Sequence, residues 1–128
     1  MKTEKFGVHL MFDGYNASET LLSDRAHLTK LLSEIPEKMV MHTICEPVVV
    51  EVGPQNHKDP GGISGFVMIA ESHISYHTFP KKGFVSADIY TCQNDLDTEK
   101  FTKLLAEAFG TTDYDVQVVD RGLRFPSE

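Results

Sequence analysis

The stretch that most constrains how this chain folds is a long β-rich hairpin around residues 80–83. Residues 66–79 favour an extended strand, Pro80-Lys81-Lys82-Gly83 is typical of a turn, and residues 84–91 favour a returning strand. The first strand does not alternate as an ordinary half-buried strand does. It runs into hydroxyl, carboxylate and imidazole groups, in the order Glu71-Ser72-His73-Ile74-Ser75-Tyr76-His77. The hairpin therefore fixes part of a sheet and also carries a cluster of reactive side chains.

The turn predicts which residues of the two strands face each other. A turn centred between Lys81 and Lys82 places Thr91 opposite Ser72 and Cys92 opposite Glu71, with side chains of directly opposed residues about 5 Å apart. A slip by one residue would move every side chain to the other face. A strand over residues 66–79 would also be much longer than the usual five or six residues. We therefore expect a bend or break near Ser72.

The remaining sequence supplies further strands and two helices. Strands are expected at residues 6–12, at 40–52 with a break at 46–47, and at 116–119, and residues 53–62 are expected to form a loop. One helix is expected to begin at Ser18 and stop at Pro36, and another to run from Asp97 or Thr98 to Gly110. The order β-α-β-β-β-α-β predicts one α+β domain over residues 1–128. We expect a two-layer α/β sandwich, with a mainly antiparallel sheet and both helices on one face.

Composition excludes several classes of function. The 128 residues carry a net charge of −7, which argues against nucleic-acid binding and favours a cationic small-molecule substrate. Apolar runs all fall well short of the roughly 20 residues that span a bilayer, and the first residues lack the apolar core of a signal peptide, so we expect no membrane association and a cytoplasmic location. In a reducing cytosol the two cysteines, Cys45 and Cys92, are expected to be free thiols.

Taken singly, the hairpin residues have ordinary explanations. A serine or histidine on an edge strand is usually solvated, and a lone cysteine is more often a small core residue than a nucleophile. His73 and His77 share a strand face, but their spacing matches no usual zinc pattern, so no metal is expected. A Ser-His hydrolase is disfavoured because Ser72 lacks a Gly-x-Ser-x-Gly elbow and a third triad member.

Taken together, these residues resemble a known signature. The matching segments are Gly62-Ile63-Ser64-Gly65, then Ala70-Glu71-Ser72-His73-Ile74-Ser75-Tyr76-His77-Thr78-Phe79-Pro80, then Asp88-Ile89-Tyr90-Thr91-Cys92. They resemble the small prokaryotic type of S-adenosylmethionine decarboxylase proenzyme, a pyruvoyl-dependent family. The opening Gly7-Val8-His9-Leu10, the helices and the last strand are also similar. The resemblance implies an α/β sandwich paired as a homodimer, or as a dimer of processed halves.

The resemblance also implies a chemistry for each matching residue. Ser72 matches the serine that attacks the carbonyl of Glu71, so that an acyl shift and a β-elimination divide the chain into residues 1–71 and 72–128. Position 72 then becomes a pyruvoyl group, the cofactor, which forms a Schiff base with the substrate and acts as an electron sink for decarboxylation. His77 matches the proton acceptor of processing, Ser64 a hydroxyl that assists there, and Cys92 the thiol that donates a proton after CO₂ is lost.

The chain departs from the family pattern in the region that recognises a nucleoside. Lys81 stands where the family usually has a glutamate associated with the ribose hydroxyls, and a cation cannot accept both hydroxyl protons. The loop 53–62 lacks the usual aromatic residue, which leaves Phe6, Phe66 and Phe79 as candidates for stacking on adenine.

Three hypotheses therefore remain at this point. The first is decarboxylation of S-adenosylmethionine to S-adenosylmethioninamine for spermidine synthesis. The second is the same cofactor acting on L-arginine or L-ornithine, a reading favoured by Lys81 because it needs no ribose contact. The third is a non-catalytic partner subunit of an active homologue, which the presence of Ser64, Ser72, His77 and Cys92 disfavours.

Overall fold

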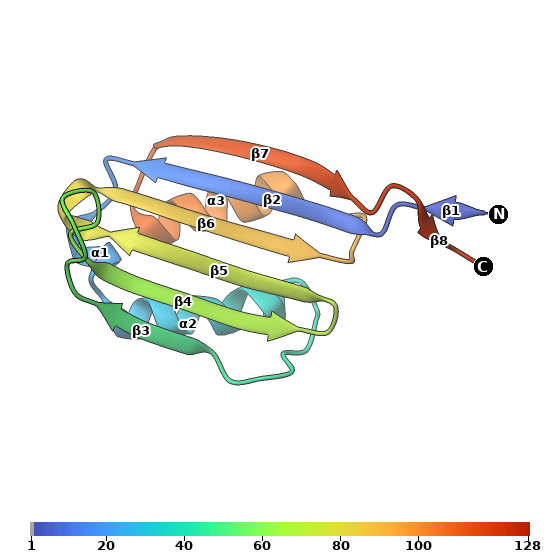
Figure 1. Cartoon of the computed structure of the whole chain (residues 1–128), viewed down its shortest axis with the longest axis horizontal. Coiled ribbons are helices and arrows are strands. Elements are labelled where there is room, and N and C mark those ends of the chain that lie inside the picture. The colour runs from blue at the N-terminus through green and yellow to red at the C-terminus, as the bar shows by residue number, and fades with distance from the viewer. Residues whose placement is uncertain (1) are drawn as a thin grey trace.

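A six-stranded antiparallel sheet forms one layer of the molecule, and the helices form the other. The computed structural model describes residues 2–128. The sheet has the strand order β3-β4-β5-β6-β2-β7, and every neighbouring pair in it is antiparallel. The helices lie behind the sheet in the view of Figure 1, all on one side of it. The predicted fold class, a two-layer sandwich with a mainly antiparallel sheet, is confirmed.

The bounds of the elements follow the chain order. They are β1 (Thr3–Glu4), β2 (Gly7–Tyr15), α1 (Glu19–Leu22), α2 (Arg25–Lys38), β3 (Val48–Val52), β4 (Gly62–Ile69), β5 (Ser72–Phe79), a short 3₁₀ turn (Pro80–Lys82), β6 (Phe84–Thr91), α3 (Thr98–Phe109), β7 (Asp113–Arg121) and β8 (Phe125–Pro126). The short strands β1 and β8 pair with each other and project from the end of the sheet, where both chain termini lie (Figure 1).

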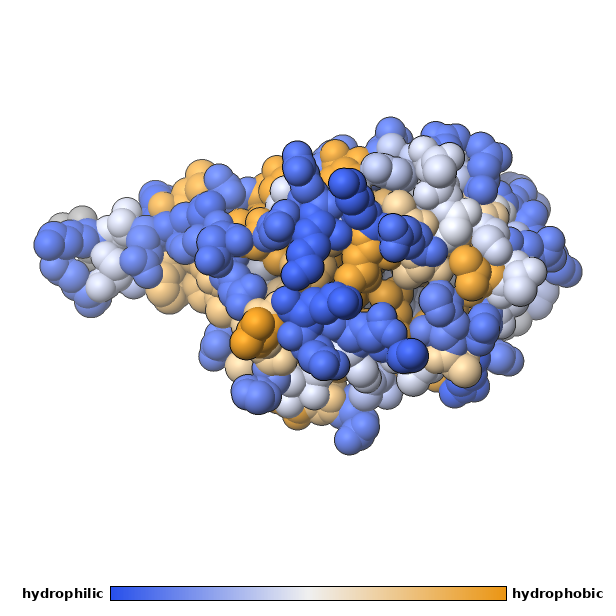
Figure 2. Space-filling view, turned by 180° about the vertical axis from the view of Figure 1, so that it is seen from behind, coloured by the Kyte–Doolittle hydropathy of each residue, from blue (hydrophilic) through white to orange (hydrophobic). Residues whose placement is uncertain are grey.

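Strict alternation along the strands gives the sheet two different faces. Along β2, Val8, Leu10 and Phe12 are buried against the helices, whereas His9 and Met11 point the other way. The buried side chains of the central strands and of α2 and α3 form one hydrophobic core. We call the helix-free side of the sheet the open face. Figure 2, seen from the opposite side, shows mainly hydrophilic side chains over the helices and apolar ones between them.

Two predictions from local sequence are confirmed: the ends of α3 and the register of the hairpin formed by β5 and β6. The side chain of Asp97 accepts a hydrogen bond from the Lys100 amide, and Gly110 ends the helix in the left-handed region at φ 66°. Phe79 pairs with Phe84 and His73 with Tyr90, which is the register expected from the Pro80–Gly83 turn.

Other expectations about the elements are wrong. The first helix is two helices, because Asp24 caps a second start by accepting a hydrogen bond from the His27 amide. Pro36 does not stop α2, since it lies buried in the last turn, where few hydrogen bonds remain to be lost. Of residues 40–52, only Val48–Val52 form a strand, and Thr43 adds an isolated bridge to Ile69.

The extended region 66–79 is two antiparallel strands rather than one. Ile69 pairs with Ser72, so residues 70 and 71 form a two-residue connection between β4 and β5. The break expected near Ser72 is confirmed, but its consequence was missed: the chain reverses there, and the sheet gains one strand over the predicted order. At the tip of this hairpin, Ser72 begins β5.

Candidate active site

The peptide bond before Ser72 lies in a strained turn. Glu71 occupies the second central position of the connection and has φ 56°. A positive φ at this position is typical of a type II turn, which normally takes glycine or asparagine there. A residue with a Cβ atom held in this region stores on the order of 1 kcal/mol of conformational strain. The strain therefore lies in the residue whose carbonyl, by the family resemblance, Ser72 is expected to attack.

The Ser72 side chain is buried and held from two sides. Ser72 is 7% exposed and points to the helix side of the sheet. Its Oγ donates a hydrogen bond to Thr91 Oγ1 at 3.3 Å and accepts one from the Cys92 amide at 3.2 Å. Thr91 is itself fully buried and accepts a hydrogen bond from the Gln93 amide at 3.1 Å. The hydroxyl is thus kept in a fixed position away from bulk water.

Cys92 comes to this point through the register of β5 and β6. It directly follows Thr91, the last residue of β6, and its side chain is half-buried and free of a disulfide. The predicted β5–β6 register is confirmed, and it brings the Cys92 amide to Ser72 Oγ. Sequence reasoning identified Thr91 as the residue opposite Ser72 but gave it no part in the site. The buried hydrogen bond between their hydroxyls is what the pattern of residue types did not reveal.

Ser64 and His77 form a second pair, on the other face of the sheet. Ser64 of β4 pairs with His77 of β5, and Ser64 Oγ lies 2.7 Å from His77 Nδ1. His77 is exposed on the open face, whereas Ser72 points into the core. Five residues of strand also separate them, a distance of about 16 Å. Within one chain the structure brings together Ser72 with Cys92 and Ser64 with His77, but it keeps the two pairs apart.

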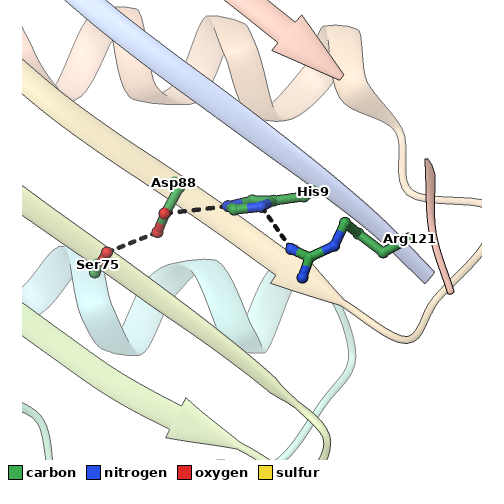
Figure 3. Close-up of polar contacts among 4 residues, drawn as sticks. All are labelled: His9, Ser75, Asp88 and Arg121. Atoms are coloured by element: carbon green, nitrogen blue, oxygen red, sulfur yellow. Dashed lines mark hydrogen bonds and ion pairs between the residues drawn. The ribbon is translucent and has the colours of Figure 1, made fainter. Parts of the chain in front are cut away.

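A polar network crosses four strands of the open face between these two pairs. Ser75 Oγ donates to Asp88 Oδ1 at 2.6 Å, and Asp88 Oδ2 lies 3.1 Å from His9 Nε2. Arg121 Nη1 lies 3.1 Å from His9 Nδ1 (Figure 3). Because a guanidinium only donates, His9 Nδ1 accepts and His9 Nε2–H donates to Asp88. The serine contacts the carboxylate instead of the imidazole, so this network does not activate Ser75 as a nucleophile.

This network could not be predicted from the sequence, because it depends on which distant strands lie side by side in the sheet. Alternation alone places His9 on the polar side of its strand and Asp88 on the polar side of another. Only the order β6-β2-β7 brings Asp88, His9 and Arg121 side by side, and that order joins segments far apart in sequence.

An aromatic cleft lies at the end of the open face farthest from Ser72. Its floor is formed by Phe79 and Phe84, whose ring centroids are 5.7 Å apart, and Tyr15 lies 5.5 Å beyond Phe84. Residues 56–59 and Lys82 complete the walls of a cavity of about 660 Å³. Of the three aromatic candidates, Phe66 instead packs near His73, and Phe6 packs on Tyr90 and Phe125. Phe79 is therefore the candidate that lines a cleft.

Other features of the described chain lie apart from this chemistry. A hollow of about 770 Å³ between α2 and α3 opens on the helix side, and none of the candidate active-site residues described above lines it. In residues 2–128, no three His, Cys, Asp or Glu side chains converge as metal ligands would. The helices that the structure describes are all too short or too polar to cross a bilayer.

Fold and site together define an α/β sandwich built around a strained, serine-containing hairpin tip. The family model for S-adenosylmethionine decarboxylase matches residues 8–122. The chain belongs to this S-adenosylmethionine decarboxylase family, and the resemblance expected from the sequence is confirmed.

Individual relatives agree with this assignment. The S-adenosylmethionine decarboxylase proenzyme of Archaeoglobus fulgidus is 33% identical over 117 residues, covering 91% of this chain and 97% of that protein. The proenzyme of Pyrococcus horikoshii is 44% identical over 64 residues, covering 50% of this chain and 46% of that protein. The crystal structure of the adenosylmethionine decarboxylase from Aquifex aeolicus has a TM-score of 0.78 at 24% identity, covers 98% of this chain and 97% of that one, and shares the fold.

Proposed function

We propose that this chain is a self-processing decarboxylase that acts on S-adenosylmethionine and uses a pyruvoyl group made from Ser72. The observation that carries the proposal is the tip of the β4–β5 hairpin. There a residue with φ 56° precedes a buried serine whose Oγ is held by Thr91 and the Cys92 amide. A relative that covers 91% of the chain bears the name proenzyme, which supports self-processing. The product, S-adenosylmethioninamine, would supply spermidine synthesis.

The strained turn supports an acyl shift as the first processing step. Ser72 Oγ attacks the Glu71 carbonyl carbon, the amide C–N bond breaks, and Glu71 becomes esterified to the serine oxygen. Removal of the Ser72 Cα proton then expels the Glu71 carboxylate and leaves a dehydroalanine, whose hydrolysis releases ammonia and gives the ketone. The first step relieves the left-handed conformation of Glu71, so the stored strain favours the forward direction.

The surroundings of position 72 fit the pyruvoyl group that this sequence of steps would leave. The group supplies an electron sink for the carbanion formed when a substrate loses CO₂. The Cys92 amide already points at the Ser72 side chain and remains available to an oxygen at that position. Cys92, whose amide contacts Ser72 Oγ, serves as the donor that protonates the substrate carbon. Thr91 and Gln93 keep this segment in place behind it.

The separation of Ser72 from His77 supports a site shared between two copies of the chain. His77 and Ser64 cannot reach the Ser72 of their own chain, because they lie on the other face and about 16 Å away. A homodimer that covers the open face brings His77 and Ser64 of one copy toward the hairpin tip of the other. His77 then removes the Ser72 Cα proton of its partner, and Ser64 orients the His77 ring through the 2.7 Å contact.

In the proposed homodimer, the aromatic cleft of one copy lies near the hairpin tip of the other, because Phe79 follows His77 on the same strand face. This cleft favours S-adenosylmethionine over arginine or ornithine. In S-adenosylmethionine the positive charge lies close to the amino-acid end, and the far end is a neutral nucleoside. In arginine and ornithine the far end is the charged group. Phe79 and Phe84 offer a flat apolar floor to a nucleobase, whereas Lys82 beside them repels a second cation. Lys81 lies next to this cleft and does not by itself indicate a dibasic substrate.

Mass spectrometry of the purified protein under denaturing conditions tests the proposal. We expect two fragments, residues 1–71 and 72–128, with the second trapped by a carbonyl reagent at its first residue. Ser72→Ala should leave one 14.3 kDa chain without activity, whereas the matched Ser75→Ala should still be cut. Cys92→Ala should be cut but should release CO₂ from S-adenosylmethionine much more slowly. An uncut wild-type chain, or an active Ser72→Ala protein, would refute the assignment.

A further inference from the structure

The aromatic cleft carries positive charge that the proposed substrate does not use. Lys58 and Lys82 line it, together with His57. Within residues 2–128, neither lysine takes part in an ion pair. The lining also contains one carboxylate, Asp59, whose Oδ1 accepts a hydrogen bond from the Gly61 amide at 3.0 Å. The two lysines outnumber this carboxylate, so the cleft carries a net positive charge in a protein of net charge −7.

The size and shape of the cleft suit a small ligand with a flat ring. Its volume of about 660 Å³ lies within the usual range of about 300–1,000 Å³ for small-molecule sites. Phe79 and Phe84 are tilted by 34° to each other and together offer an extended aromatic surface. A ring stacked there would lie within the same cavity as the two lysines, whose ammonium groups are charge-assisted donors for an attached anion.

We propose that this cleft binds a nucleoside monophosphate, with its base on Phe79 and Phe84 and its phosphate at Lys58 and Lys82. The ligand class follows from the two features that the cleft combines, a ring-binding floor and unpaired cations. Phe79 is two residues from His77 on the same strand and the same face, a distance of about 7 Å. A bound nucleotide therefore lies beside the Ser64–His77 pair. If the proposed function holds, the nucleotide competes with S-adenosylmethionine, and binding itself does not depend on that function.

Calorimetric titration of the full-length Ser72→Ala protein with AMP, adenosine and inorganic phosphate tests the binding. AMP should bind about tenfold more tightly than adenosine, and only the AMP affinity should fall steeply with added salt. Lys58→Gln and Lys82→Gln together should reduce AMP affinity to that of adenosine. Lys30→Gln, which removes an exposed lysine from α2 on the far side of the sheet, should leave it unchanged. Phe84→Leu should weaken AMP and adenosine alike.

Equal affinities for AMP and adenosine, no effect of the double lysine variant, or no AMP binding at millimolar concentration would each overturn the inference. Competition is measured separately, with processed wild-type protein and S-adenosylmethionine as substrate. A chain that binds AMP as expected but is never cut would refute the proposed function and leave the nucleotide site standing. A chain that is cut and active but does not bind AMP would refute the nucleotide site and leave the proposed function standing.

Discussion

Tyr76 carries its hydroxyl into the core, where it has no hydrogen-bond partner among residues 2–128. Its side chain is 1% exposed, packs against Phe109 and covers Gly65, where an added Cβ would lie within 2.5 Å of the Tyr76 hydroxyl oxygen. A buried, unpaired hydroxyl costs about 1–3 kcal/mol. Tyr76→Phe should therefore stabilise the protein by about 1 kcal/mol in urea unfolding. Tyr90→Phe is the matched control, because Tyr90 lies on the open face and is only half-buried; an equal gain there would contradict the explanation.

The burial of Tyr76 also predicts that the folded protein loses stability at alkaline pH. Burial raises the pKa of Tyr76 above its ordinary value of about 10. Above pH 10 the unfolded chain releases this proton while the folded chain keeps it, so stability falls as the pH rises. The stability difference between Tyr76→Phe and wild type should be constant below pH 10 and should widen above it. A difference that stays constant up to pH 11 would show that the hydroxyl titrates alike in both states.

The strain at Glu71 predicts how a substitution beside the scissile bond changes the cleavage rate. Glycine adopts a positive φ without strain, so Glu71→Gly should relax the uncut form. Losing about 1 kcal/mol of ground-state strain would slow cleavage about fivefold. Ala70→Gly adds flexibility at the neighbouring position, which has no positive φ, and should leave the rate nearly unchanged. The rates are measured by following the uncut chain after refolding, and faster cleavage of Glu71→Gly would contradict the strain argument.

At the scale of elements, the end of α2 contains a second strained residue. Met41 N donates to Pro36 O and Val40 N to Glu37 O, which is the pattern of a Schellman motif with Val40 at the left-handed position. Val40 has φ 57° and is 88% exposed, although this position normally takes glycine. Val40→Gly should raise the free energy of unfolding by about 1 kcal/mol. Val40→Ala keeps a Cβ atom and should gain less; an equal or larger gain for alanine would contradict the motif as the cause.

The elements that could be predicted from the sequence are those set by local chemistry. The Pro80–Gly83 turn fixed the β5–β6 register, and with it the meeting of Ser72 and Cys92. Asp97 and Gly110 marked α3 correctly. The reversal at residues 70–71 could not be predicted, because it places a glutamate where a turn ordinarily takes glycine. A sequence pattern favours unstrained conformations, so it misses a turn that is held in place by the packing of the strands on either side.

The relation between the two halves of the site was also beyond sequence reasoning. Ser64, Ser72 and His77 lie close together in sequence, which suggests a single cluster. Strand alternation separates them, since Ser72 and His77 are an odd number of residues apart and point to opposite faces. The pairing of Ser64 with His77 depends on the β4–β5 reversal that was missed.

At the scale of the whole molecule, the strand order interleaves the two segments that cleavage would separate. Residues 1–71 supply β2, β3 and β4, and residues 72–128 supply β5, β6 and β7. β2 lies between β6 and β7, and β4 pairs with β5. Four strand pairings, three in the sheet and that of β1 with β8, therefore join the segments without the peptide bond, and the core beneath the sheet adds to them. Cleavage at the hairpin tip can change position 72 while the sheet that holds it stays intact.

A site shared between two copies makes a prediction that one chain acting alone does not. A His77→Ala chain keeps its own Ser72 but offers no imidazole to its partner, so it should be cut at least about 100-fold more slowly than wild type. A Ser72→Ala chain cannot be cut but still carries His77. When the two are unfolded together and refolded as a mixture, the His77→Ala chain in mixed dimers should be cut at a rate close to that of wild type, and the Ser72→Ala chain should remain whole.

A size tag on one of the two chains distinguishes them in a denaturing gel, and native mass spectrometry counts the mixed dimers. The control mixture is a His77→Ala chain with a chain that carries both Ser72→Ala and His77→Ala, which should yield no cutting because neither copy supplies the imidazole. Mixed dimers that form but stay uncut would show that His77 of one copy does not serve Ser72 of the other. A His77→Ala chain that is cut alone at the normal rate would place His77 outside the processing step. Rescue in the first mixture and not in the second follows from the geometry of β5, where His77 faces away from the serine of its own strand and is exposed on the open face.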